Sequence, residues 1–115
     1  MKHLCLVLTE PMEGKAAEFA DYYENVHLDE ALSTTGWESA QRFVLTDQIG
    51  QACPLPHLAL YEIEADDPKT VIRKLNDTRA QRRQSDSLNR KTAAVWVFSE
   101  SGPLHRRADR SDRQD

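Results

Sequence analysis

The chain has 115 residues, of which 39% are hydrophobic and 30% are charged. This length fits one domain, and the composition is typical of a globular protein rather than a disordered or fibrous one. No apolar run approaches the roughly 18–20 residues that a membrane helix needs, so no membrane partner is expected. The apolar run near the start is too short for a signal peptide, and the expected location is the cytoplasm.

The charges and the metal-binding residue types exclude further classes of protein. The net charge is −4, and no aromatic residues are interleaved with the Lys and Arg residues, so no nucleic-acid partner is expected. Cys5 and Cys53 lie far apart and are expected to be reduced thiols packed as small hydrophobes. The four histidines show no ligand spacing, and neither a metal nor a cofactor is expected.

The first half of the chain predicts a strand followed by a helix. Residues 3–9 form a strand that is apolar on both of its faces. Residues 14–32 form a helix, because apolar residues recur at spacings of three and four and make one stripe. The segment Ser33-Thr34-Thr35-Gly36 ends the helix. Near His27 the sequence leaves open whether the helix kinks or restarts.

The second half predicts two adjacent strands, a helix and a last strand: 37–46, 57–65, 68–83 and 92–99. Gly50, Pro54 and Pro56 mark a loop between the two strands. Asp66-Asp67-Pro68 is typical of a helix start, with an acidic N-cap before proline.

This order of elements, βαββαβ, predicts an α+β, ferredoxin-like fold. Right-handed crossovers place both helices on one face of a four-stranded antiparallel sheet. The domain covers residues 1–103, and the charged segment 104–115 is expected to be a disordered tail. Because three strands are apolar on both faces, the open sheet face needs a cover, and a homodimer through that face is expected.

Two segments carry a resemblance to a known family. Phe19-x3-Tyr23-x3-His27 and the later Gly36-Trp37-x-Ser39-Ala40-Gln41-Arg42-Phe43 resemble the EthD-like branch of the dimeric alpha-beta barrel superfamily. The resemblance covers about residues 3–103. It implies a homodimer with a cleft between the first helix and the sheet of each subunit, and an acid/base role for His27.

Three residues are the candidate catalytic groups. His27 has a side chain whose ordinary pKa lets it move protons near neutrality, and a core histidine held by a hydrogen bond is the alternative. Tyr23 would donate a hydrogen bond to a substrate oxygen, or else belong to the core. Arg42 would neutralise an enolate or carboxylate, or else pair with Glu62.

Four aromatic residues are the candidate substrate-binding groups: Phe19, Trp37, Phe43 and Tyr61. Their rings would hold a flat, apolar or aromatic ligand. Trp37 would equally plug the end of the barrel, and Tyr61 has a place in the core or the dimer interface as its alternative.

The sequence thus favours a small cofactor-independent enzyme acting on a flat apolar carbonyl compound, of isomerase, dehydratase or cyclase type. Its status as an enzyme is open. A non-catalytic dimeric module for a small ligand or a protein is the rival hypothesis. An auxiliary protein of a catabolic pathway and a cofactor-free monooxygenase are further alternatives.

Overall fold

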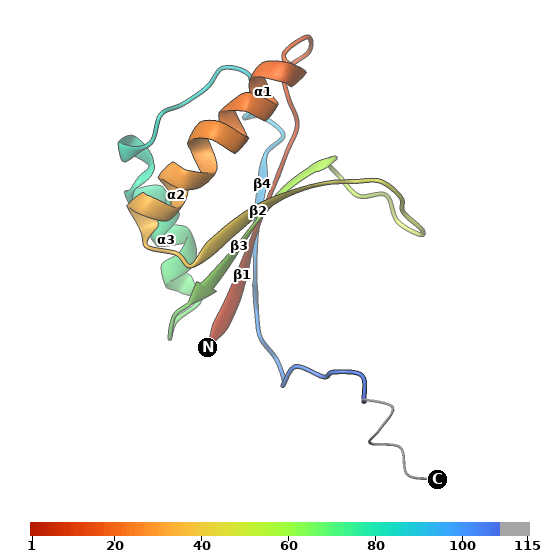
Figure 1. The fold of residues 1–115 in the computed structure, drawn as a ribbon, viewed down its shortest axis with the longest axis vertical. Coiled ribbons are helices and arrows are strands. Elements are labelled where there is room, and N and C mark those ends of the chain that lie inside the picture. Colours follow the sequence, from red (N-terminus) through yellow and green to blue (C-terminus); the bar gives the residue numbers. More distant parts are fainter. Residues whose placement is uncertain (109–115) are drawn as a thin grey trace.

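The computed structural model describes residues 1–108 of the chain (Figure 1). Its strands are β1 (Lys2–Thr9), β2 (Ser39–Val44), β3 (His57–Glu64) and β4 (Ala94–Ser99). They form one antiparallel sheet in the order β2-β3-β1-β4. The long first helix and α3 (Lys69–Asp77) cover one face of this sheet, which confirms the predicted ferredoxin-like α+β fold.

The first helix consists of three consecutive segments. These are α1 (Ala16–Tyr22), the π-helical η1 (Tyr23–His27) and α2 (Leu28–Thr35). Gly36 ends the helix with φ of 78°, a left-handed conformation that glycine adopts without steric cost, and its N–H donates to the Leu32 carbonyl. The helix thus begins at Ala16 and ends at Thr35, two residues after the expected start and three after the expected end. The irregularity expected near His27 is the π segment.

The later elements are shorter than the sequence predicts. The expected helix 68–83 ends at Asp77, followed by the 3₁₀ turn η2 (Arg79–Gln81). It begins at Lys69, one residue later than expected, and the Asp67 carboxylate accepts the N–H of Lys69 at 2.9 Å. The strand expected at 37–46 is shorter at both ends, and the strand expected at 92–99 begins only at Ala94, where ladder pairing with β1 starts.

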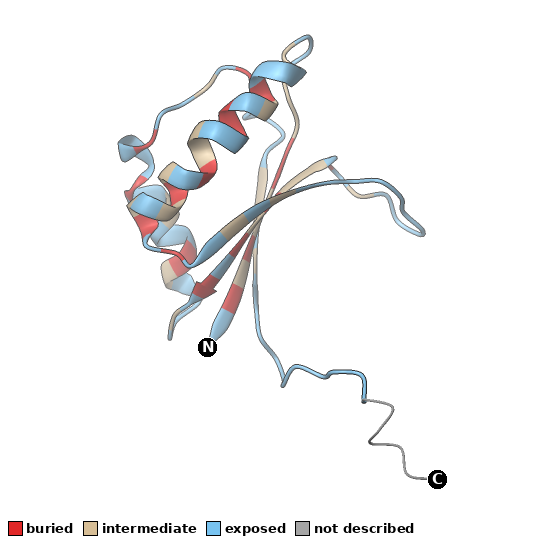
Figure 2. Cartoon of the chain, viewed as in Figure 1, coloured by how far each residue is buried: buried red, intermediate tan, exposed pale blue. Residues whose placement is uncertain are grey.

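The register of the strands decides which side chains meet the helices. Cross-strand partners share a face. Cys5 pairs with Tyr61 and Val97 on the helix-facing side, and Leu6 pairs with Leu60 and Trp96 on the open side. The core therefore lies between the sheet and the helices, as the buried residues in Figure 2 show.

Two segments extend away from the helical layer (Figure 1). One is the loop 45–56 between β2 and β3, and the other follows β4 from residue 100. Residues 104–108 are exposed and lie in no helix or strand. The rest of the expected tail, 109–115, lies outside the described residues.

Candidate active site

The π segment of the first helix sets the position of the aromatic residues. The Leu28 N–H donates to the Tyr23 carbonyl five residues earlier, where an α-helix would use the residue four earlier. The wider turn lets two successive tyrosines, Tyr22 and Tyr23, both be buried. Tyr23 packs against Phe19 one turn earlier, with ring centroids 4.9 Å apart.

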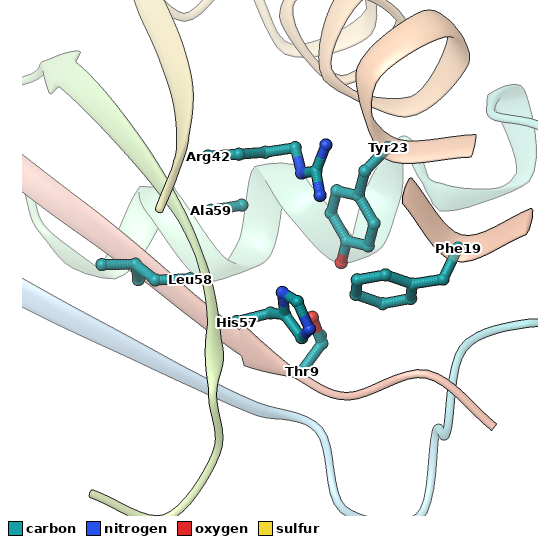
Figure 3. A pocket seen from close by; sticks show the side chains of 7 residues that line it. All are labelled: Thr9, Phe19, Tyr23, Arg42, His57, Leu58 and Ala59. Atoms are coloured by element: carbon teal, nitrogen blue, oxygen red, sulfur yellow. The ribbon is translucent and has the colours of Figure 1, made fainter. Parts of the chain in front are cut away.

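A pocket lies beside these two rings, between the first helix and the sheet (Figure 3). Phe19 and Tyr23 come from the helix, Arg42 from β2, His57 from the start of β3 and Thr9 from the end of β1. Thr9 and His57 meet because they are register partners, and the small side chain of Ala59 sits opposite Arg42 in the ladder. Three expected site residues, Phe19, Tyr23 and Arg42, thus come together.

The Arg42 guanidinium lies at the edge of the pocket. Its Nη1 donates to the Glu24 Oε2 at 3.2 Å and to the Ala20 carbonyl at 3.4 Å. The expected alternative, an ion pair with Glu62, is wrong. Successive strand residues point to opposite faces, and the register places Glu62 opposite Ser39 on the open face, where it pairs with Lys2 at 3.7 Å.

The ionisation of the pocket suits proton transfer. Burial, and to a smaller extent the nearby Arg42, lower the pKa of His57, so its imidazole is uncharged at neutral pH. Burial raises the pKa of Tyr23, against a smaller opposite effect of a hydrogen bond with Thr9, so its phenol keeps its proton. The pocket therefore presents a neutral base, a hydroxyl donor and a fixed positive charge.

The pocket is tightly closed in this conformation. The space between its walls is about 150 Å³, including its open mouth, and none of it admits a water-sized sphere. The Phe19 ring lies 4.9 Å from the His57 ring, centroid to centroid. Any ligand must therefore move Phe19 or Arg42 aside when it enters.

His27 does not line this pocket but belongs to a separate cluster. Its ring stacks on Tyr22 and meets the edge of Tyr23, with centroid distances of 5.1 and 5.0 Å. The Tyr22 hydroxyl donates its single proton to the Arg83 carbonyl at 2.8 Å, so it accepts from His27 Nδ1 at 3.0 Å. This bond fixes the tautomer and leaves Nε2 unprotonated.

The pKa of His27 is lowered to about 4, first by burial and then by the charge of Arg82. Arg82 is itself only 6% exposed. Its guanidinium donates to the hydroxyls of Thr34 and Thr78 and to the Leu75 carbonyl, while its Nε has no partner among the described residues. The cluster thus ties η2 and α3 to α2.

The remaining expected substrate-binding residues lie elsewhere. Trp37 is buried and packs edge-on against Tyr61, which is also in the core. Phe43 pairs with Leu58 on the open face, opposite to the face that carries Arg42. The structure therefore does not bring these three residues to the Tyr23–Arg42 pocket.

Thr9 and His57 are pocket residues that the sequence did not single out. Both lie at strand ends, where the pattern of apolar residues carries no information about neighbours. Their meeting follows only from the antiparallel register of β1 and β3. A polar residue at the end of one predicted strand and another at the start of its neighbour is the one signal that was present.

Comparison with models of known protein families and with curated proteins finds no match for the chain. Among residues 1–108, no three His, Cys, Asp or Glu side chains gather as a metal site requires. Within the same residues, no helix is both long and apolar enough to cross a bilayer.

Proposed function

We propose that the protein performs acid–base chemistry on a small, flat carbonyl compound in the Tyr23–Arg42 pocket. The observation that carries the proposal is the convergence of three complementary groups, His57, Tyr23 and Arg42, beside the aromatic wall of Phe19. A neutral imidazole accepts a proton from the carbon next to a carbonyl. A phenol hydroxyl and a guanidinium stabilise the negative oxygen that then develops.

In this proposal His57 moves the proton, since it faces the pocket. His27 is the residue that the EthD-like resemblance implies, and its acid/base role stays a prediction. Its unprotonated Nε2 is a competent acceptor, but Tyr23 must shift before a ligand in the pocket reaches it. A bound cofactor is not part of this chemistry, because proton transfer next to a carbonyl needs none.

Deuterium exchange tests this function. Wild-type protein in D₂O is expected to exchange the hydrogens next to the carbonyl of an aromatic ketone or lactone, followed by proton NMR. His57→Gln is expected to slow the exchange by about 100-fold, the usual lower range for loss of a general base. His27→Gln is the matched comparison, because slow exchange in it alone would assign the base to His27 instead. Equal rates for wild type and His57→Gln would refute the role of His57.

A non-catalytic ligand-binding module is the second candidate, favoured by the closed state of the pocket. For a module, a panel of ketones, lactones and enols raises the melting temperature without deuterium exchange. A ligand at 100 times its Kd stabilises the fold by about 2.7 kcal/mol, or several degrees for a domain of this size.

We also propose that the active form is a homodimer through the open sheet face. This face carries apolar side chains from all four strands: Leu4, Leu6, Phe43, Leu58, Leu60, Trp96 and Phe98. Phe43, Trp96 and Phe98 are among the exposed large hydrophobic residues of the chain. A second copy offers the same apolar face and buries both at once.

Light scattering measures this assembly. Wild type is expected to show twice the mass of one chain at micromolar concentration, and Trp96→Lys is expected to show one. Ile72→Lys on α3 is the matched control, because Trp96 and Ile72 are both 42% exposed but only Trp96 lies on the sheet. A single-chain mass for wild type would contradict the dimer.

A further inference from the structure

At the mouth of the pocket, the Arg42 guanidinium is already paired with a carboxylate of the protein itself. The Glu24 Oε2 lies 3.2 Å from the Arg42 Nη1. The Glu24 side chain is 62% exposed, whereas that of Arg42 is 26% exposed. Arg42 is thus held in the pocket wall, whereas Glu24 is largely solvated. Ion pairs with such an exposed partner contribute little to stability.

The other residues that line the pocket carry no negative charge that would repel an anion. Its lining residues are Thr9, Phe19, Tyr23, Arg42, His57, Leu58 and Ala59, and none of these is acidic. The hydroxyl of Tyr23 is a hydrogen-bond donor that can turn to an incoming oxygen. Phe19 offers a ring face for a flat ligand.

We infer that the pocket binds a small planar carboxylate, which replaces Glu24 as the partner of Arg42. This inference rests on the proposed function, because it concerns the same pocket, and it names the class of ligand. A guanidinium holds a carboxylate by two parallel hydrogen bonds, whereas Glu24 receives one from Nη1. The closed state of the pocket in this conformation favours a small ligand.

Exchange of partners also explains how a closed pocket admits a ligand. The Arg42 side chain is tied to the helix by Glu24 and by the Ala20 carbonyl at 3.4 Å, the limit of a hydrogen bond. When a ligand carboxylate takes the guanidinium, both of these contacts are released. Arg42 then turns with its new partner, and the mouth of the pocket opens.

The test is a titration of the full chain with sodium benzoate, followed by heteronuclear NMR at low ionic strength. Benzamide, which has the same shape but no charge, is the control ligand. Wild type is expected to bind benzoate and not benzamide. Arg42→Gln is expected to weaken benzoate binding by at least about tenfold, and Arg42→Lys by less, since Lys keeps the charge but not the paired hydrogen bonds.

Glu24→Gln gives the decisive result. Removal of the internal competitor is expected to tighten benzoate binding by about two- to fivefold, the range that exposed ion pairs allow. Glu18→Gln is the matched control, because it removes the same charge from an exposed position of the same helix. Equal tightening by both variants would show a general field effect and overturn the exchange.

The failure of this inference differs from the failure of the proposed function. Absence of benzoate binding, or equal binding of benzamide, overturns the carboxylate ligand even if neutral ketones exchange deuterium. Benzoate binding that Glu24→Gln tightens supports the inference even if no carbonyl compound is turned over.

Discussion

Two polar clusters near Tyr23 use similar side chains in different ways. Around His27, the Tyr22 hydroxyl is hydrogen-bonded to the imidazole and to the Arg83 carbonyl. The nearby Arg82 donates to two threonine hydroxyls and to the Leu75 carbonyl. Around His57, the hydroxyls, the imidazole and the guanidinium of Arg42 face one pocket, and Arg42 alone holds a charged partner. The cluster with more internal hydrogen bonds therefore serves the fold, and the less bonded one is available to a ligand.

The largest expected change in stability is that of Arg82→Ala, in the cluster around His27. This change removes a buried guanidinium and leaves the Thr78 hydroxyl and the Leu75 carbonyl without that donor. We expect the free energy of unfolding to fall by about 3 kcal/mol, because buried hydrogen bonds to charged groups are costly to lose. Urea denaturation followed by circular dichroism measures it.

Arg83→Ala is the matched control for this change. The neighbouring Arg83 side chain is 72% exposed and pairs with Glu30 at 3.1 Å. Exposed ion pairs contribute at most about 1 kcal/mol. If Arg82→Ala costs no more than Arg83→Ala, the cluster does not hold α2, α3 and η2 together.

The next effect is a dependence of stability on pH. His27 has a pKa of about 4 in the folded protein and of 6.5 ordinarily, so the unfolded chain binds the proton more tightly. Its contribution to stability is complete above pH 6.5 and is lost as the pH falls from 6.5 towards 4. The loss is at most roughly 3–4 kcal/mol, since one pKa unit corresponds to about 1.4 kcal/mol.

Denaturation curves between pH 7 and 4 measure this dependence in wild type and in His27→Asn. Asparagine has an amide that can donate to Tyr22 but does not titrate. His27→Asn is expected to lose less stability than wild type over the same interval, whereas His57→Asn keeps most of the wild-type slope. Identical slopes for wild type and His27→Asn would place the titration elsewhere.

The fold was predictable from the sequence, because apolar periodicity and turn residues report local structure. The meeting of Tyr23 and Arg42 was predictable as well, since the fold sets the first helix over β2. The position of His27 was not, because the helical spacing of 3.6 residues fails where the π segment adds a residue to the turn. The pairing of Tyr22 with His27, five residues apart, follows from that extra residue.

Arg42 and Phe43 show a second limit. Adjacent residues of a strand point to opposite faces, so only one of them can face the cleft. The pattern of β2 does not say which, because both of its faces mix polar and apolar residues. The register with β3 decides it, by pairing Arg42 with the buried Ala59 and Phe43 with Leu58. His57 and Thr9 become neighbours by the same long-range register.

The smallest expected effect is that of Glu24→Gln on the free energy of unfolding. The exposed pair with Arg42 is expected to contribute less than about 0.5 kcal/mol to the free energy of unfolding, measured by urea denaturation. Glu30→Gln is the matched change in the other cluster, where the carboxylate accepts the Arg83 N–H at 2.8 Å and its Nε at 3.1 Å. Glu30→Gln is expected to cost more than Glu24→Gln, because one of its oxygens satisfies a backbone donor. The reverse order would mean that Arg42 is held for the fold and is not free to exchange its partner for a ligand.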